Sequence, residues 1–424
     1  MVQLMVIADD FTGALDTGVH FASKGIRTRV IVSLGDDRSW DEGLRSDQAT
    51  VLVVDAETRH VPAGQAYRKV YAIVEDGKRA GIPYIYKKTD SALRGNIGSE
   101  LEAAYRASGE EFLIFVPALP QMKRVTRGGI QYIDGTPVSR SVFGVDPFEP
   151  VTEDSVEKII HLQSEIHVDE ASGLDQESWE NPGIVVFDAQ TEEEIRQIGA
   201  RAASLGHGGL MAGCAGFASI LPDLLGLERQ AVEETRLEEK LFVICGSVNP
   251  ITKRQLECAA LAGYPRVYMT PEEKLDQARW RSEDGGPLIK KLVWESVSND
   301  CVILDSNDPE GAKSTLDAAK EKGMDTEAVR QGIQETLGII LKKLLDTGLH
   351  PVWLVTGGDT LLGFMKEIRQ WELQPVREIR PGCVLTKLNY SGQEYHIITK
   401  SGGFGEENLL LELTEELKPK QTER

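Results

Sequence analysis

The feature that most constrains the fold is a regular alternation of short apolar segments with amphipathic segments of helical period. Leu4–Ala8 has the pattern of a buried strand, and Leu15, Val19 and Ala22 then recur at i, i+4 and i+7, as on one face of a helix. Further strands are expected at Val51–Val54, Tyr84–Tyr86, Phe112–Val116, Ile184–Asp188 and Gly209–Met211. Short continuous apolar strands joined by helices are typical of a parallel sheet covered on both faces. The pattern therefore predicts the α/β class.

The chain has 424 residues, which is too long for one ordinary hydrophobic core. A charged stretch at Leu227–Glu239 interrupts the alternation, and it is either a domain boundary or a charged surface helix. The alternation then restarts with a strand at Leu241–Cys245 and continues through a helix at Ala328–Leu345 and strands at Val352–Val355 and His396–Thr399. We predict two domains, residues 1–230 and 240–424, each with a mainly parallel sheet flanked by helices.

Composition and charge exclude several classes of function. The formal net charge of −20 argues against nucleic-acid or anionic-membrane partners, because both would repel the average surface. No apolar run approaches the roughly 20 residues that span a bilayer, and the N-terminus lacks the pattern of a signal peptide. The cysteines are scattered without a CxxC pair, and the histidines without metal-ligand spacing, so we expect no metal site and a cytoplasmic protein.

Three segments of the second half share one arrangement of strand, small-residue turn and helix. Their turns lie at Cys245–Ser247, Thr356–Thr360 and Ser401–Gly405. Glycine lets backbone N–H groups approach an anion, and a helix N-terminus adds partial positive charge. A single turn of this kind is common in any strand-to-helix connection, but three favour a ligand that carries phosphate. The sequence has neither a Walker motif nor a dinucleotide-binding G-x-G-x-x-G turn.

Polar clusters follow two strands of the first half. Asp9 and Asp10 come directly after the first strand, either as a helix cap with a solvated neighbour or as a hydroxyl-binding group or general base. A haloacid-dehalogenase-type phosphatase is an alternative, although its Asp-x-Asp spacing is missing. After Tyr84–Tyr86, one loop carries Lys88, Asp90, Ser91, Arg94 and Asn96. This mixture suits a hydroxylated carboxylic acid, and the alternative is a helix start with surface charges.

Two other basic features are less specific. Arg59 follows its own strand and could add a second cation, although taken alone we interpret it as a surface residue. Residues 117–150 break the alternation with prolines and glycines, which predicts a loop or hairpin insertion. We interpret its basic patch, Lys123, Arg124 and Arg127, as solvated surface, with a lid over an anionic substrate as the alternative.

Together these segments resemble the four-carbon acid sugar kinase family, which phosphorylates threonate, erythronate or their oxo forms with ATP. The resemblance is carried, in chain order, by IADDFTGALDTG, KKTDSALRGNIG, VPALPQMKR, FGVDPFEPVTEDSV, CGSVNPITKRQ, TGGDT and KSGGFG. By position it implies sugar-acid contacts from Asp9 or Asp10, Arg59, Lys88, Thr89, Asp90 and Ser91. It implies ATP contacts from Ser247, Gly357, Gly358, Asp359, Thr360, Gly402, Gly403, Phe404 and Gly405. One departure is Asp359, where the family commonly has glutamate.

The expected reaction is in-line transfer of the γ-phosphoryl group of Mg-ATP to the terminal hydroxyl of a four-carbon acid sugar such as D-threonate or D-erythronate. Lys88 and Arg94 would neutralise the substrate carboxylate or the moving phosphoryl group. Asp90, or one of Asp9 and Asp10, would orient or deprotonate the hydroxyl. A 3-oxo-tetronate kinase, the phosphatase and a non-catalytic nucleotide sensor remain alternatives. The sequence does not reveal the oligomeric state, and a homodimer is our working expectation.

Overall fold

The computed structural model describes residues 1–33, 38–45, 47–146, 149–171, 179, 181–231, 235–282 and 286–418. The chain divides into two compact units, Met1–Val232 and Glu233–Arg424. The described residues of the charged stretch before Leu241, 227–231 and 235–239, form no helix and no strand.

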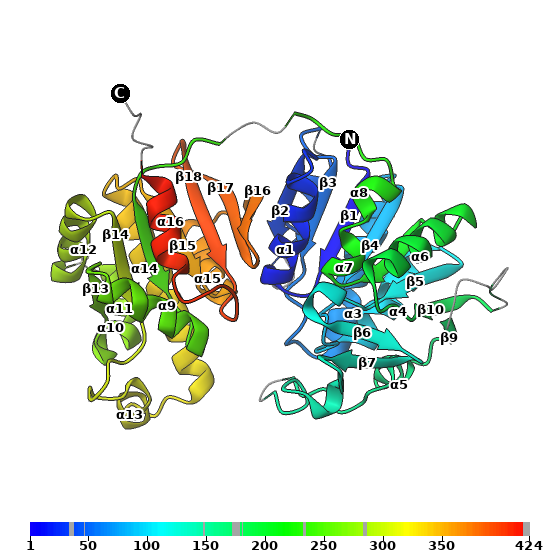
Figure 1. Ribbon diagram of the computed structural model, residues 1–424, viewed down its shortest axis with the longest axis horizontal. Helices are drawn as coiled ribbons and strands as arrows, with labels where there is room; N and C mark the ends of the chain where they lie inside the picture. The colour runs from blue at the N-terminus through cyan, green and yellow to red at the C-terminus, as the bar shows by residue number, and fades with distance from the viewer. Residues whose placement is uncertain are drawn as a thin grey trace. The chain divides into compact units, whose positions relative to one another are not determined.

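The first unit is built on a sheet whose paired strands all run parallel (Figure 1). The strand order is β2 (Thr28–Val32), β3 (Val51–Asp55), β1 (Leu4–Ala8), β4 (Tyr84–Lys88), β11 (Leu210–Gly213), β5 (Phe112–Val116), β10 (Gly183–Phe187) and β9 (Val168–Ala171). The central strands are completely buried, which explains why they are apolar without alternation.

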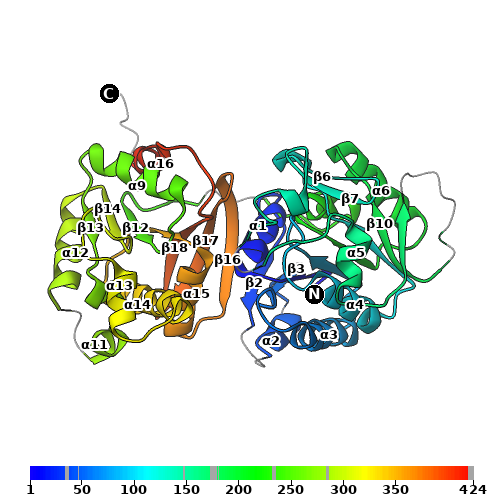
Figure 2. The ribbon, with the colours of Figure 1, turned by 90° about the horizontal axis from the view of Figure 1, so that it is seen from below.

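Helices cover both faces of this sheet, as Figure 2 shows. One group consists of α2 (Trp40–Leu44), α3 (Ala63–Arg79), α4 (Ile97–Ser108) and α5 (Val156–His161). The other consists of α1 (Phe11–Ala22), α6 (Glu192–Ser204), α7 (Ala215–Ala218) and α8 (Leu221–Leu224). The predicted insertion contains two short 3₁₀ helices, Pro120–Met122 and Val138–Arg140, and a small antiparallel sheet of β6 (Arg124–Arg127), β7 (Ile130–Ile133) and β8 (Thr136–Pro137).

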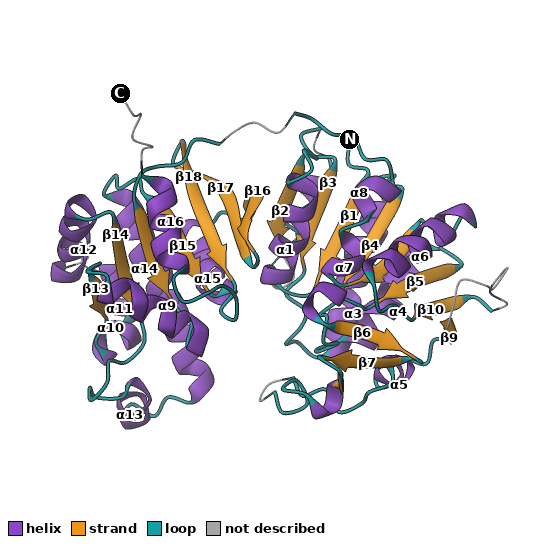
Figure 3. Ribbon diagram, in the orientation of Figure 1, coloured by secondary structure: helices purple, strands orange, loops and turns teal. Residues whose placement is uncertain are grey.

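The second unit repeats the layered arrangement, with helices on both sides of its strands (Figure 3). Its strand order is β13 (Arg266–Tyr268), β14 (Cys301–Asp305), β12 (Leu241–Cys245), β15 (Val352–Thr356), β18 (Gln393–Lys400), β17 (Cys383–Tyr390) and β16 (Glu372–Arg380). The pairs from β13 to β18 are parallel, whereas β18, β17 and β16 form an antiparallel meander.

The helices of the second unit fall into two groups. On one face lie α9 (Pro250–Leu261) and α16 (Leu409–Leu417), whose leucines pack on alternate residues of β12 and β14. The other helices are α10 (Pro271–Leu275), α11 (Gln277–Ser282), α12 (Gly286–Ser298), α13 (Thr315–Glu321), α14 (Thr326–Asp346) and α15 (Gly358–Ile368). The predicted α/β class, with mainly parallel sheets flanked by helices, is confirmed. Among the described residues, no helix is both long and apolar enough to cross a membrane.

Candidate active site

Neighbouring strands of the first unit end at the same level of the sheet. Ala8 of β1 is paired with Asp55 of β3 and with Lys88 of β4, and Lys88 is paired with Gly213 of β11. The loops that follow parallel strands share one edge, which is where such sheets bind ligands. This edge gathers the sugar-acid residues expected from the sequence: Asp9, Asp10, Arg59, Lys88, Thr89, Asp90, Ser91 and Arg94.

Arg59 is the centre of this cluster. Its Nε lies 2.7 Å from Asp9 Oδ2, and its Nη1 lies 2.7 Å from Asp10 Oδ2. Its Nη2 lies 3.9 Å from Asp90 Oδ1, and its backbone N–H donates to the carbonyl of Asp9. Burial alone would lower the pKa of Arg59, but the three carboxylates outweigh it and raise the pKa well above its ordinary value. Arg59 is therefore a buried, permanently charged residue and not a surface one.

The two adjacent aspartates have different surroundings. Asp10 caps α1, because its Oδ1 accepts a hydrogen bond from the backbone N–H of Gly13 at 3.0 Å. Asp9 is buried, and its Oδ1 has no hydrogen-bond partner among the described residues. Burial alone would raise the pKa of Asp9, but Arg59, with Lys87 and Lys88 nearby, lowers it. Both carboxylates are thus held in place by the structure that surrounds them.

Asp90 is bound by arginine through both of its oxygens. Arg94 Nε lies 2.9 Å from Oδ2 and Arg94 Nη2 lies 3.0 Å from Oδ1, which is a bidentate ion pair. The backbone N–H groups of Ala92 and Arg94 also donate to Oδ2. Burial alone would raise the pKa of Asp90, but Arg59 and Arg94 hold it far below the ordinary value. Such a carboxylate is a weak base, so this geometry argues against Asp90 as the group that deprotonates a hydroxyl.

The two consecutive lysines at the end of β4 differ in their partners. Lys87 is fully buried and pairs with Glu100 at 2.7 Å. Lys88 is also buried, yet its Nζ donates only to the carbonyl of Thr89, at 2.9 Å, and it forms no ion pair with any described residue. Gly13 makes room for it, since a Cβ built there would lie 2.8 Å from Lys88 Nζ. Lys88 is therefore a buried cation without an ion-pair partner among the described residues.

Two further residues at this edge were not singled out from the sequence. Asp55 ends β3, and Glu57, two positions later, adopts a left-handed backbone conformation with φ of 48°. Burial and the neighbouring Glu57 raise the pKa of Asp55 well above its ordinary value. Glu57 Oε1 accepts a hydrogen bond from the backbone N–H of Phe11, at the start of α1. The spacing of two acids directly after a strand is the signal that could have identified them.

The interpretation of Arg124 as solvated surface is wrong. Arg124 is half-buried and donates a hydrogen bond from Nη1 to Ser91 Oγ. Its guanidinium also lies over the ring of Phe143, 5.0 Å from the centroid. Arg127 and Lys123 of the same basic patch are exposed, as expected. The insertion therefore adds one arginine to the edge of the sheet.

In the second unit the three glycine-containing turns also meet at one edge. Thr356 of β15 is paired with Cys245 of β12 on one side and with Lys400 of β18 on the other. The carbonyl of Gly402 accepts a hydrogen bond from Thr252 Oγ1 at 2.9 Å, which ties the third turn to the helix after the first. A Cβ built on Gly402 would lie 2.8 Å from Ser247 Oγ, so the two turns are in close contact. The three small-residue turns therefore lie together at one edge of this unit's sheet.

The individual turn residues differ in what they offer to a ligand. Gly357 has a φ of 91°, which L-residues rarely adopt, and it precedes α15 without a side-chain cap. The first N–H groups of α15 are therefore available to an anion. Asp359 faces away, because its Oδ2 accepts from Arg330 at 2.6 Å and from Gln334 at 2.8 Å, both on α14. Thr360 is buried against Gly246 and is the helix residue nearest to the first turn.

The remaining residues of the third turn are held from outside it. Gln255 Nε2 of α9 donates to the carbonyls of Phe404, at 3.1 Å, and Glu406, at 2.9 Å. Gly405 has a φ of 87°, and a Cβ on it would lie 2.8 Å from Leu409. Gly403 is open, with no atom closer than 3.7 Å to such a Cβ. These small residues leave the backbone exposed to a phosphate chain, so the turns fit a nucleotide.

Asn307 and Asp305 support the first turn and were also missed. Asn307 Nδ2 donates to the carbonyl of Ser247 at 3.1 Å and to Asp305 Oδ1 at 2.8 Å. Asp305, fully buried at the end of β14, accepts from Arg266 through its other oxygen at 2.7 Å. The apolar strand Cys301–Leu304 followed by a polar run is the pattern that could have indicated them. No group of three or more metal-ligating side chains is found among the described residues.

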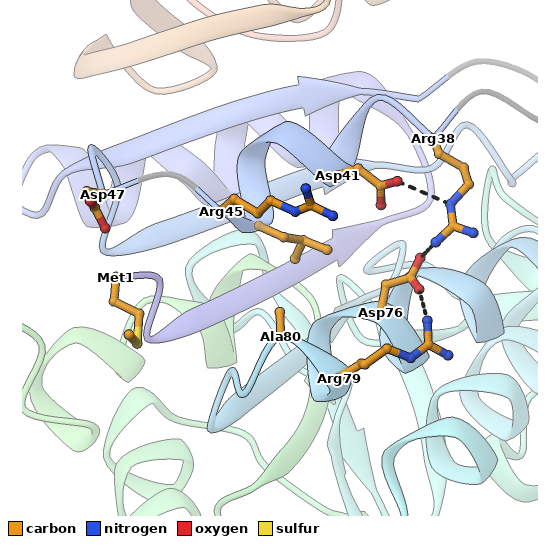
Figure 4. A pocket seen from close by; sticks show the side chains of 9 residues that line it. Met1, Arg38, Asp41, Arg45, Asp47, Asp76, Arg79 and Ala80 are labelled. Atoms are coloured by element: carbon orange, nitrogen blue, oxygen red, sulfur yellow. Dashed lines mark hydrogen bonds and ion pairs between the residues drawn. The ribbon is translucent and has the colours of Figure 1, made fainter.

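A hollow of about 430 Å³ lies at the opposite edge of the first unit's sheet (Figure 4). Met1 precedes β1 and Ala80 precedes β4, which places the hollow at the amino ends of these strands. Figure 4 shows Arg38 and Arg79 turned toward Asp76, which accepts hydrogen bonds from both. None of the predicted site residues lines this hollow, so the candidate active site remains at the carboxyl edge.

Comparisons with known proteins agree with the division into two units. Residues 4–221 match a family model described as a sugar-binding N-terminal domain, and residues 242–410 match one described as a nucleotide-binding C-terminal domain. The fold and these matches define a protein of two ligand-binding α/β domains. A solved structure of a Haemophilus influenzae protein has a TM-score of 0.75 with 21% identity, covers 97% of this chain and 99% of its own, and shows the shared fold.

Full-length relatives identify the family. A D-threonate kinase of Salmonella typhimurium is 30% identical over 429 residues, which cover 96% of this chain and 97% of the relative. A D-erythronate kinase of Heliobacterium modesticaldum is 26% identical over 434 residues, which cover 96% and 94%. This chain therefore belongs to the four-carbon acid sugar kinase family, and the resemblance found in the sequence is confirmed.

Proposed function

We propose that this protein is an ATP-dependent kinase that phosphorylates the terminal (4-) hydroxyl of a four-carbon acid sugar, such as D-threonate or D-erythronate. The observation that carries the proposal is family membership over nearly the whole chain, with a relative named D-threonate kinase. The carboxyl edge of the first unit supports it chemically, because Lys88 is a buried cation that forms no ion pair with a described residue and is surrounded by groups that bind hydroxyls. The first unit would hold the acid and the second the nucleotide.

The roles of the first unit's residues follow from their partners. Lys88 would neutralise negative charge on the acceptor or on the moving phosphoryl group, because it forms no ion pair with a described carboxylate. Asp90 would keep Arg94 and Arg59 in place, since its low pKa suits an ion pair and not a base. Asp10, which is fixed by Gly13 and Arg59 and lies partly open, would orient the acceptor hydroxyl. Phosphoryl transfer depends mainly on positioning and charge, so a weak base suffices.

The second unit would bind ATP through its backbone. The N–H groups at Gly358 and in the turn Gly402–Gly405 would contact the phosphates, and Ser247 would lie beside them. We propose that Mg²⁺ arrives with the nucleotide and neutralises its phosphates. A cytoplasmic location and a homodimer stay predictions.

The test is a coupled assay of ADP release by the full chain, with a panel of D-threonate, D-erythronate and their 3-oxo forms. We expect release of ADP that depends on one or more of these acids, and little without any acid. Turnover of a 3-oxo acid alone would move the assignment to a 3-oxo-tetronate kinase. ATP binding without turnover of any acid would contradict the kinase, and phosphate release from a sugar phosphate without ATP would indicate the phosphatase instead.

A further inference from the structure

The small antiparallel sheet of the insertion is docked on the loop that carries the candidate acid-binding residues. Gln131 of β7 is fully buried, and its Nε2 donates to the carbonyl of Ser91 at 2.9 Å. Thr126 of β6 orients this amide by donating to its Oε1 at 2.8 Å. Both side chains are satisfied in the interior, so the contact is built and specific. The insertion is therefore part of the wall of the candidate site.

This sheet presents Arg124 to the site in a fixed position. The backbone of Arg124 exchanges two hydrogen bonds with Leu119, at 2.7 and 3.1 Å, which fixes the start of β6. Its guanidinium donates to Ser91 Oγ and lies over the ring of Phe143. A side chain held at its base, along its length and at its tip loses little further freedom when it binds a ligand.

The cations at this edge differ in whether they form an ion pair with a described residue. Arg59 is paired with Asp9 and Asp10, and Arg94 is paired with Asp90. Arg124 and Lys88, by contrast, form no ion pair with any described residue. Burial lowers the pKa of Arg124, as expected for a charge that its surroundings do not fully compensate.

The two cations without an ion pair contact the same loop. Lys88 Nζ donates to the carbonyl of Thr89 at 2.9 Å, and Arg124 donates to Ser91 Oγ, two residues further along. The backbone N–H of Thr89 donates to the carbonyl of Gly213 at 2.8 Å, which holds this loop at the end of β11. Lys88, from the end of β4, and Arg124, from the insertion, therefore contact residues of this loop that are two positions apart.

We propose that Arg124 and Lys88 together bind the carboxylate of the acceptor, and that Arg124 makes the protein select an acid over an uncharged polyol. The inference rests on the proposed function in that the acceptor is a four-carbon acid. A carboxylate suits this place because a guanidinium presents paired N–H donors that match its two oxygens, while the ammonium adds a second charge. Neutralisation of the phosphoryl group in transit by Arg124 is the competing role.

The experiment measures binding to the full-length protein by calorimetry, with Arg124→Gln and the matched control Arg127→Gln. Arg127 lies on the same strand but is exposed, over Tyr132. Each protein is titrated with the tetronates of the panel and with the uncharged amide of the acid that binds best. We expect Arg124→Gln to weaken binding of the acid about 10- to 100-fold, the effect of one charged hydrogen-bonding partner. Binding of the amide, and all binding by Arg127→Gln, should stay within about twofold.

The outcomes separate this inference from the proposed function. Unchanged binding of the acid by Arg124→Gln overturns the inference, and a fall in kcat with unchanged binding assigns Arg124 to the phosphoryl group. Equal losses for acid and amide also overturn it, because the residue would then act through the fold. If Arg124→Gln does not fold, Arg124→Lys is used instead. Binding of the acid that is at least tenfold weaker, with binding of the amide unchanged, supports the inference. Unchanged binding of the acid refutes it. If the wild-type protein binds a tetronate without turning it over, the proposed kinase activity is contradicted and the inference is not. If the wild-type protein binds no tetronate, the inference is overturned.

Discussion

The substitution Gly13→Ala would test whether the position of Lys88 matters. Gly13 is the third residue of α1, and a Cβ built there would lie 2.5 Å from Asp10 Oδ1 and 2.8 Å from Lys88 Nζ. Both distances are shorter than real Cβ contacts, so the cap and the ammonium must shift. Alanine in place of glycine in a helix contributes about 0.5–1 kcal/mol. A weakened cap costs about 1 kcal/mol, so the free energy of unfolding should change by less than about 1 kcal/mol.

Activity should respond far more strongly than stability. A displacement of about 1 Å at a charge that positions the acceptor costs on the order of 10²-fold in rate. We therefore expect kcat/KM for the acid to fall about 100-fold, measured by ADP release, while urea unfolding stays near wild type. The matched control is Gly64→Ala in the first turn of α3, where the nearest atom would lie 3.7 Å away, so activity should be unchanged. Wild-type kcat/KM in a folded Gly13→Ala protein would refute the role given to Lys88.

Three further predictions concern other parts of the chain. In the native protein at pH 8, Cys258 should be the cysteine that a thiol reagent labels readily, and fast labelling of a second would contradict the described burial. Burial raises the pKa of two of the other thiols to about 12, those of Cys245 and Cys301. Asn307→Ala should raise the KM for ATP about five- to tenfold with kcat little changed, because the turn at Ser247 loses a hydrogen bond. A fall in kcat without a change in KM would refute this role of Asn307. Burial alone would raise the pKa of Glu238, but its hydrogen bond to His396 at 2.9 Å outweighs this and lowers it. Glu238 therefore stabilises the fold above about pH 4.5 and loses this contribution as the pH falls through its lowered pKa. The difference in the free energy of unfolding between wild type and Glu238→Gln, measured in urea, should thus shrink below about pH 4.5. A difference that does not depend on pH would contradict this role of Glu238.

The order of strands and helices could be predicted because continuous apolar runs and apolar residues at helical spacing indicate different local geometries. A buried parallel strand such as β1 must be apolar on both faces, and the helix after it must carry an apolar stripe. The grouping of polar residues at one edge followed from the same pattern, since parallel strands end on the same side. Asp9, Arg59 and Lys88 could thus be placed near one another without any knowledge of their contacts.

The partners of each charge could not be predicted in this way. The sequence shows a carboxylate at Asp90 but not that Arg94 and Arg59 bind it, and these partners decide whether it acts as a base or as an anchor. The position of Arg124 is still more difficult to predict. The hairpin that carries Arg124 folds back on the loop at Ser91, and the hydrogen bond between Gln131 and Ser91 joins residues 40 positions apart. The basic patch alone does not distinguish Arg124 from Arg127. The docking of the small sheet partly buries Arg124 and leaves Arg127 exposed.

The turn before α15 illustrates the same limit within a single motif. The sequence TGGDT marks the end of a strand and the start of a helix, and both are where the motif predicts. Successive residues of a helix, however, point about 100° apart, so Asp359 and Thr360 cannot both face the turn. Thr360 lies against Gly246, whereas Asp359 binds Arg330 on α14. The charge at position 359 therefore stabilises the packing of two helices. We expect the turn to bind anions through N–H groups whose positions depend on Gly357 and not on any side chain.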